Sequence, residues 1–154
     1  KDIILTAIDQ VFGSIPRPRT MVRNPNHCPE CADHETVMQA VTPKNITLKE
    51  IGKIGRDPVC YLTDNAYCYF VPGFARLVVS TGIDDDYSYL DQFIFHLKVG
   101  SRIETFTSEQ RCAMIQLIDY LREAIVEELV VKTVVPTYVD ELDQIRDSLS
   151  AEAC

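Results

Sequence analysis

The chain has 154 residues, 46% of them hydrophobic, and its 15 basic and 23 acidic side chains leave a formal net charge of −8. This length fits one domain whose core is large enough to fold without disulfide bonds, although the chain holds six cysteines. The negative charge repels nucleic acid and anionic membranes, so we expect neither as a partner.

We expect a soluble protein of the cytoplasm on two further grounds. No apolar run approaches the ~20 residues of a membrane-spanning helix. No leader with a basic start and an apolar centre opens the sequence.

The first predicted helix covers residues 2–12, where apolar side chains recur at helical spacing and Gly13 follows as a stop. Residues 13–26 contain three prolines and therefore form a loop. This loop also holds three arginines, Arg17, Arg19 and Arg23. They would either form a clamp for a carboxylate or phosphate or lie solvated, and we favour the solvated loop.

A second helix is predicted over residues 29–41, because proline suits the first helical position and a Thr-Pro pair follows the last one. Its buried side should carry Val37, Met38 and Val41. Two later pairs, Thr47 with Glu50 and Thr107 with Gln110, have the spacing of a capping box. The first pair opens a short helix, and the second opens the longest helix of the chain.

Thr63 can cap a further helix, whose apolar periodicity from Tyr67 to Val78 continues through Pro72. This pattern predicts a kinked helix or two abutting helices. Residues 81–87 then form a loop with three adjacent aspartates. We interpret these aspartates as a solvated turn, because the alternating ligands of a calcium loop are missing.

Ser88 is the predicted cap of the next helix, which ends at Gly100 and includes His96. We interpret His96 as a partly buried structural histidine, because nothing near it in the sequence orients it as a base. Residues 130–135 are compatible with a short strand or an extended connection. An amphipathic helix from Tyr138 to Leu149 follows, and it would pack on its own core or on a second chain.

These elements predict an all-α protein of six or seven helices, and residues 1–154 form a single compact domain. Alternating strand patterns are nearly absent from the sequence, and no internal repeat or linker divides it.

Chemically active side chains are concentrated in residues 27–35, which hold two cysteines, two histidines and three acidic residues. Cys28, Cys31 and His34 recur at every third position near the start of the second helix, so they can converge on one zinc ion. A closed structural site needs a fourth ligand, which would be His27, Asp33 or a more distant cysteine. A water in that position would instead indicate a catalytic metal.

Two other interpretations of the two cysteines stay open. A cysteine at a helix N-terminus is stabilised as thiolate, which suits redox chemistry, although Glu30 opposes the charge and no thioredoxin-like strand pattern is present. The simplest interpretation is structural: Cys28 caps the helix, Cys31 packs inward, and the acidic residues complement the helix dipole.

Two segments carry a resemblance to a known family. One is His27-Cys28-Pro29-Glu30-Cys31-x-x-His34, and the other is Leu62-Thr63-x-x-Ala66-x-x-Tyr69-Phe70-Val71-Pro72. Together they resemble the Cys-x-Glu-Cys and Leu-Ser/Thr-x-x-Ala-x-x-Tyr-Tyr-Leu-Pro segments of a family of small, uncharacterised bacterial helical proteins. Val71 replaces the usual leucine. The resemblance implies a helical fold and no catalytic assignment.

Two functions follow from these observations. We favour a non-enzymatic module that binds another protein, in which Cys28, Cys31 and His34 either hold a structural zinc or serve as structural residues without a metal. The alternative is a metal-dependent or thiol-dependent enzyme that uses the same three residues, with Glu30 or Glu35 moving protons.

Overall fold

The computed structural model describes residues 1–52, 56–81, 89–100, 102–131 and 137–151, with residues 128–131 and 137 described by their backbone only. Within these ranges the protein has seven α-helices, two short 3-10 helices and no β-strand, so the all-α prediction is confirmed. In chain order the elements are α1 (Asp2–Phe12), α2 (Pro29–Ala40), α3 (Leu48–Ile51), η1 (Pro58–Tyr61), α4 (Asp64–Ser80), α5 (Tyr89–Lys98), η2 (Ile103–Thr105), α6 (Ser108–Val131) and α7 (Thr137–Ser150).

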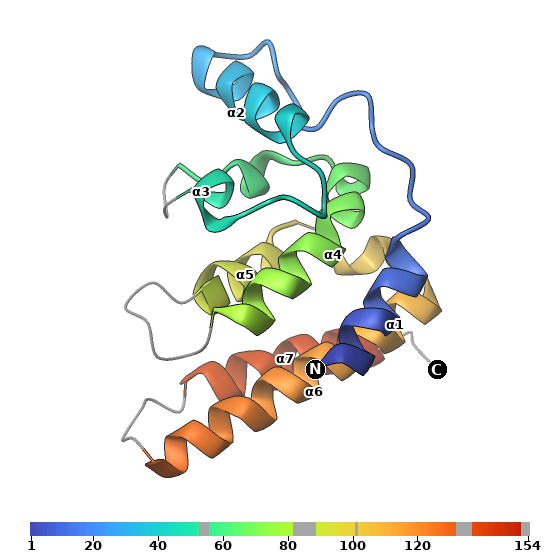
Figure 1. Cartoon of the computed structure of the whole chain (residues 1–154), viewed down its shortest axis with the longest axis vertical. Helices are drawn as coiled ribbons and strands as arrows, with labels where there is room; N and C mark the ends of the chain where they lie inside the picture. The colour runs from blue at the N-terminus through green and yellow to red at the C-terminus, as the bar shows by residue number, and fades with distance from the viewer. Residues whose placement is uncertain (53–55, 82–88, 101, 132–136, 152–154) are drawn as a thin grey trace.

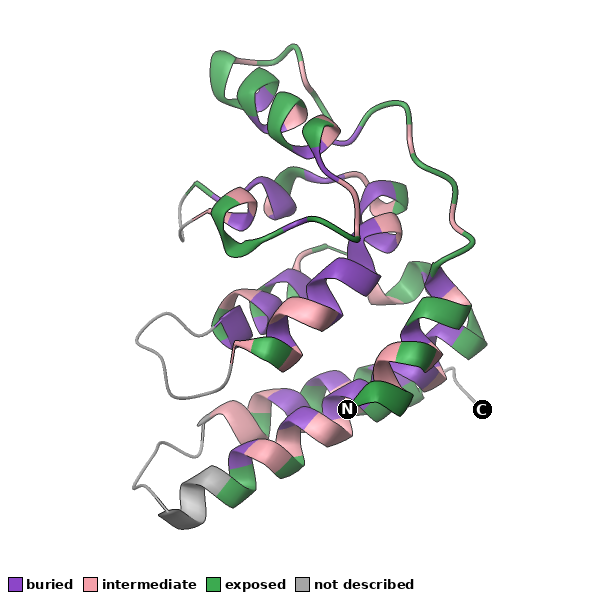
Figure 2. Cartoon of the chain, in the orientation of Figure 1, coloured by how far each residue is buried: buried purple, intermediate pink, exposed green. Residues whose placement is uncertain are grey.

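The helices form three tiers along the long axis of the molecule (Figure 1). The α6–α7 pair lies at one end, α4 and α5 lie in the middle, and α2 and α3 lie at the other end. Helix α1 packs against both α4 and α6. The buried residues are densest along the inner faces of α4, α5 and α6, and they continue as a narrow stripe into α2 (Figure 2).

Local capping explains where several helices begin. Both predicted capping boxes are present: the Thr47 N–H donates to Glu50 Oε2 at 3.0 Å, and the Thr107 N–H donates to Gln110 Oε1 at 3.0 Å. The Thr63 hydroxyl accepts from the Ala66 N–H at 3.2 Å and so caps α4, as predicted. Each cap satisfies a backbone donor that the first helical turn leaves without a partner.

Helix α4 runs through Pro72 as one element, so the structure selects a single helix over two abutting ones. Gly73, the residue after Pro72, lets the turn before α3 pack closely against α4. A Cβ atom added at Gly73 would lie 2.6 Å from Ile46 Cγ2 and 2.8 Å from the Pro43 carbonyl oxygen. Only glycine therefore allows the chain before α3 to approach α4 this closely.

The last helix packs on its own chain. Leu142, Ile145 and Leu149 on α7 are at most 2% exposed. Two ion pairs tie α7 to α6, Arg122 Nε to Asp143 Oδ1 at 2.8 Å and Arg146 Nε to Asp119 Oδ1 at 2.7 Å.

The loop before α2 is joined to the segment before α4. Val22 and Leu62 form an isolated antiparallel bridge. On either side of it, the Arg23 N–H donates to the Tyr61 carbonyl at 2.9 Å, and the Thr63 N–H donates to the Met21 carbonyl at 2.8 Å. These contacts hold the start of α2 close to the start of α4.

One sequence expectation for α2 is corrected. Its buried stripe consists of Cys31, His34 and Met38, spaced by three and four residues. Val37 lies beside this stripe and is 37% exposed, so it is not a core residue.

Residues 130 and 131, which the sequence placed in a short strand or extended connection, belong to α6 instead. The aspartates at 84–86, the Ser88 cap and residues 132–135 lie outside the described residues. Among the residues that are described, no helix combines the length and apolar character needed to cross a membrane.

Candidate functional site

The candidate site lies at the N-terminus of α2. Cys28 is the N-cap residue in extended conformation, and Pro29 occupies the first helical position, as predicted. The Cys28 sulfur accepts a hydrogen bond from the Cys31 N–H at 3.4 Å. Cys28 thus replaces the oxygen that usually caps a helix, and its sulfur is held over the positive end of the helix dipole.

The two cysteine sulfurs lie 3.1 Å apart, and His27 Nδ1 lies 4.0 Å from the Cys31 sulfur. The three donor atoms of His27, Cys28 and Cys31 are all within 4.8 Å of one another. His27 is exposed, Cys28 is partly exposed and Cys31 is 8% exposed. The structure therefore brings together Cys28 and Cys31, two of the three predicted ligands, with His27, one of the candidates for the fourth.

The two sulfurs differ in their affinity for a proton. The pKa of Cys28 is lowered to about 7, first by the hydrogen bond from the Cys31 thiol, then by the Cys31 N–H and by His27. The pKa of Cys31 is raised, first by its hydrogen bond to Cys28 and then by burial and by repulsion from the Cys28 charge. Cys28 therefore ionises first, and Cys31 keeps its proton.

His34 lies outside this group of donor atoms. It belongs to the core-facing stripe of α2 and is 8% exposed. Its ring packs on Tyr61 with centroids 5.0 Å apart, and its Nε2 lies 3.7 Å from a carboxylate oxygen of Glu30. Its stripe position directs the ring toward Tyr61, and Nε2 is buried without a hydrogen-bond partner.

The Glu35 side chain is hydrogen-bonded to the loop before α2. Its carboxylate accepts hydrogen bonds from the N–H groups of Met21 and Val22, each at 2.8 Å, and from the Gln39 side-chain amide at 2.9 Å. A carboxylate held by these donors has a structural role, so it is a poor candidate for proton transfer. Glu30, whose side chain is 53% exposed, is the acidic residue that stays accessible beside the cysteines.

The arginines of the loop do not converge on one point. Arg17 donates to the Val41 carbonyl at 3.2 Å and to the Gln39 carbonyl, so it caps the C-terminal end of α2. Arg23 pairs with Asp64 at 3.1 Å, at the start of α4. Arg19 offers its carbonyl to the Gln39 amide at 2.8 Å. These contacts fix the loop and do not build an anion clamp.

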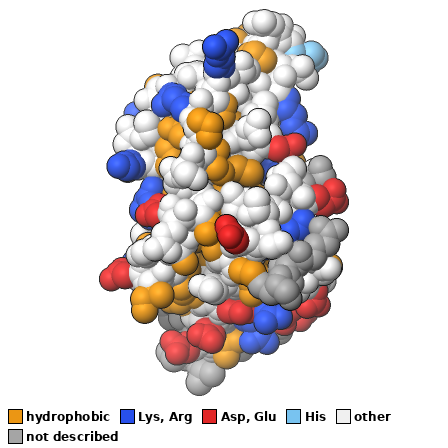
Figure 3. All heavy atoms as spheres, turned by 90° about the vertical axis from the view of Figure 1, so that its right-hand side faces the viewer, with side chains coloured by type: hydrophobic (Ala, Val, Ile, Leu, Met, Phe, Trp, Pro, Cys, Tyr) orange, Lys and Arg blue, Asp and Glu red, His pale blue; other side chains and the backbone are white. Residues whose placement is uncertain are grey.

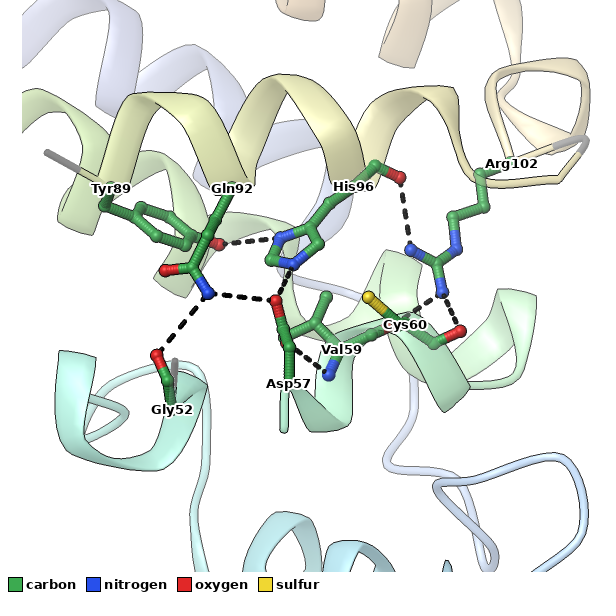
Figure 4. A network of polar contacts seen from close by, with 8 residues as sticks. All are labelled: Gly52, Asp57, Val59, Cys60, Tyr89, Gln92, His96 and Arg102. Atoms are coloured by element: carbon green, nitrogen blue, oxygen red, sulfur yellow. Dashed lines mark hydrogen bonds and ion pairs between the residues drawn. The ribbon is translucent and has the colours of Figure 1, made fainter. Parts of the chain in front are cut away.

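A second group of donor atoms, from Asp57, Cys60 and His96, lies in the interior (Figure 4). His96 Nε2 contacts Asp57 Oδ2, and His96 Nδ1 lies 3.3 Å from the Tyr89 hydroxyl. Gln92 donates to the same Asp57 oxygen at 3.1 Å, and the Val59 N–H donates to the other at 2.9 Å. His96 is fully buried, so the structure places it deeper than the sequence predicted.

Arg102 completes this network. Its side chain is fully buried and donates to the carbonyls of Val59 at 2.6 Å, His96 at 3.1 Å and Cys60 at 3.3 Å. The guanidinium carbon lies 4.4 Å from the centre of the Tyr67 ring, in a cation–π contact. Arg102 therefore connects the 57–60 segment, α5 and α4.

The chemistry of this second group is structural. Burial, followed by the charge of Asp57, raises the pKa of Cys60 to about 11, so the thiol is not a nucleophile at neutral pH. Both nitrogens of His96 are already engaged, by Asp57 and Tyr89. Cysteine, histidine and aspartate thus lie together without the nucleophile–base hydrogen bond that catalysis needs.

Comparison with family models, with curated proteins and with solved structures finds no match for this chain. The resemblance to a family of small bacterial helical proteins therefore stays a prediction.

Proposed function

We propose that this protein is a cytoplasmic protein-interaction module that binds Zn²⁺ at the start of α2. The observation that carries the proposal is the convergence of His27, Cys28 and Cys31, whose donor atoms lie within 4.8 Å of one another. Two thiolates and an imidazole are ligands that zinc prefers. Zinc bound there would hold the loop before α2 to the first turn of the helix.

The geometry of the cysteines supports this assignment after a small adjustment. Two sulfurs on one tetrahedral zinc lie about 3.8 Å apart, which follows from Zn–S bonds of about 2.3 Å. The observed separation is 3.1 Å, so the sulfurs must move apart by less than an ångström. Cys28 precedes the helix and its side chain can rotate without disturbing α2.

The fourth ligand is a separate question with two candidates. The sequence predicts His34, which can reach the ion only if its ring leaves Tyr61. The other candidate is water or a partner's side chain, because His27 and Cys28 open toward solvent. The first arrangement would close the site, and the second would leave it open to exchange.

The charge distribution supports a basic protein as the partner. Residues 108–150 hold nine acidic and four basic side chains, whereas residues 1–47 hold five of each. On the face that Figure 3 shows, acidic side chains lie mainly in the lower half, where α6 and α7 lie, and basic ones mainly in the upper half. An acidic end attracts a basic surface and leaves the zinc site free at the opposite end.

Metal content tests the zinc proposal directly. The protein is purified without chelator or affinity tag, loaded with excess zinc and desalted, and zinc per chain is measured by mass spectrometry. We expect about one zinc per chain. Cys28→Ser and Cys31→Ser should lose the metal, and Cys68→Ser, which alters a buried free thiol on α4, should keep it. A wild-type chain that retains no zinc would overturn the proposal.

Two histidine variants identify the remaining ligands. If His27 is a ligand and His34 is not, His27→Asn weakens zinc binding and His34→Asn leaves it unchanged. A loss in both variants would indicate a closed site with four protein ligands.

The partner proposal has its own test. Binding partners are captured with the wild type, with Glu123→Lys/Asp147→Lys on the α6–α7 end and with the control Glu30→Lys/Asp33→Lys on α2; all four positions are exposed. We expect a basic protein to be lost from the first variant only. Equal capture by all three proteins would contradict an acidic docking end.

A further inference from the structure

We propose that the metal-free Cys28–Cys31 pair carries out dithiol–disulfide exchange on disulfides of small thiols or flexible peptides, with Cys28 as the attacking sulfur and Cys31 as the resolving sulfur. This activity goes beyond zinc binding and does not depend on it. Because the same two sulfurs would hold the metal, exchange belongs to the protein without zinc.

The first support is the distance between the sulfurs. They lie 3.1 Å apart, and a disulfide bond needs about 2.0 Å, so the pair must close by about one ångström. Only two residues separate the cysteines, and Cys28 lies outside the helical turn that holds Cys31. Side-chain rotation at Cys28 can therefore form the bond while α2 stays intact.

The second support is the difference in access. Cys28 is partly exposed, whereas Cys31 is 8% exposed and belongs to the buried stripe of α2. A hollow of about 400 Å³, lined by Arg23, Asn24, Pro25, Asn26 and His27, lies next to Cys28 along the chain. An incoming disulfide reaches Cys28 first, and Cys31 is placed to attack only the sulfur of Cys28.

The third support is the hydrogen bond at the capping position. The Cys31 N–H points at the Cys28 sulfur, at the N-terminal end of the α2 dipole. This donor stabilises negative charge on Cys28 both when it attacks and when it later leaves during reduction. Of the other free thiols among the described residues, Cys68 is buried, and Cys60 is partly exposed but packed close to Asp57 and His96.

The exchange balances in two steps. The Cys28 thiolate attacks one sulfur of the substrate disulfide, the substrate S–S bond breaks, and the first thiolate leaves and takes a proton from solvent. The Cys31 thiol then loses its proton to solvent and attacks the Cys28 sulfur, and the second substrate thiolate leaves and is protonated. The protein dithiol is oxidised by two electrons, and one substrate disulfide is reduced to two thiols.

Oxidised glutathione is the probe. The reduced, metal-free protein is mixed with it at neutral pH without oxygen, and the products are mapped by mass spectrometry of the intact chain and of its proteolytic fragments. We expect the wild type to lose two hydrogens, to release two glutathione thiols and to carry an internal Cys28–Cys31 disulfide.

Single variants separate the two roles. Cys31→Ser should stop at a mixed disulfide between glutathione and Cys28. Cys28→Ser should react at Cys31 at least about tenfold more slowly, because that sulfur is buried. Serine is itself a good N-cap, so Cys28→Ser keeps α2 folded. Cys31→Ala serves as the second variant at the buried position if serine disturbs the packing.

Two results would overturn the exchange proposal. One is a wild-type chain that forms no internal disulfide, including one that stops at the mixed disulfide. The other is equal reaction rates for the Cys28→Ser and Cys31→Ser variants. The zinc test uses no oxidant, so a chain that binds zinc and forms no disulfide overturns only this inference, and a chain that forms the disulfide and binds no zinc overturns only the proposed function.

Discussion

The Glu35 carboxylate on α2 accepts a hydrogen bond from the backbone N–H of Met21 at 2.8 Å, so a helix side chain fixes the loop that precedes its own helix. A second oxygen contact from the Met21 N–H, at 3.1 Å, and one from the Val22 N–H, at 2.8 Å, complete the arrangement. The charged carboxylate of Glu35 therefore fixes the positions of the loop residues Met21 and Val22.

Glu35→Ala should lower the free energy of unfolding by about 2–3 kcal/mol, because it leaves the backbone donors of Met21 and Val22 without their charged acceptor. Urea denaturation measures this loss. Amide hydrogen exchange should accelerate at the same two residues. Glu35→Gln is the matched variant: its side-chain oxygen can still accept from both donors, so it should lose less. Equal losses in both variants would contradict a role for hydrogen bonding.

Alkylation of metal-free protein by iodoacetamide should be half-maximal near pH 7 at Cys28, because its pKa is lowered to about 7 and only the thiolate reacts. Cys60, with a pKa raised to about 11, should react only in strongly alkaline solution. Labelling at each site is followed by mass spectrometry across pH.

The Cys31→Ala variant tests which contact lowers the pKa of Cys28. The hydrogen bond from the Cys31 thiol is the largest contribution to the lowered pKa of Cys28, so the variant should move the Cys28 profile to higher pH. An unchanged profile would show that the thiol contact does not set the reactivity of Cys28.

Asp57→Ala should destabilise the fold by about 3–5 kcal/mol, because it removes one member of a buried pair and leaves His96 and the Val59 N–H without their acceptor. Chemical denaturation measures the change. The surface pair of Arg76 with Asp9, at 3.1 Å, supplies the control, and Asp9→Ala should cost less than about 1 kcal/mol. Similar costs at both sites would argue against an organising role for Asp57.

Gly73→Ala should lower stability by about 1–3 kcal/mol, because the new methyl group would overlap Ile46 Cγ2 and the Pro43 carbonyl. Thermal and urea unfolding would both report the loss. Asn65→Ala, at an exposed position of the same helix, should be neutral or slightly stabilising, since alanine has the higher helix propensity. A stable Gly73→Ala protein would mean that the turn before α3 moves away from α4 at little cost.

Sequence patterns predicted the elements whose causes are local. Thr63, Thr47 and Thr107 form caps because each side-chain hydroxyl accepts from a backbone N–H within three residues. The same patterns do not predict whether α4 continues through Pro72, because packing against other elements decides between one helix and two.

In the candidate site, too, sequence patterns predicted only the contacts that have local causes. Cys28 and Cys31 meet because both belong to one helix start, but the choice of His27 over His34 depends on Tyr61, which no short pattern places beside α2. The Asp57–His96 pair joins residues 39 positions apart, and the sequence around one residue gives no sign of its contact with the other. Asp57 also accepts a hydrogen bond from the Val59 N–H at 2.9 Å, a local contact within the same segment.

The bridge between Val22 and Leu62 connects the loop before α2 to the segment before α4. Cys28 lies six residues after Val22, and the N-cap of α4, Thr63, directly follows Leu62. A backbone displacement between Val22 and Cys28 would therefore be transmitted through the bridge to the start of α4. The amide resonances of Arg23 and Thr63, whose hydrogen bonds flank the bridge, would act as remote sensors of the chemical state of Cys28.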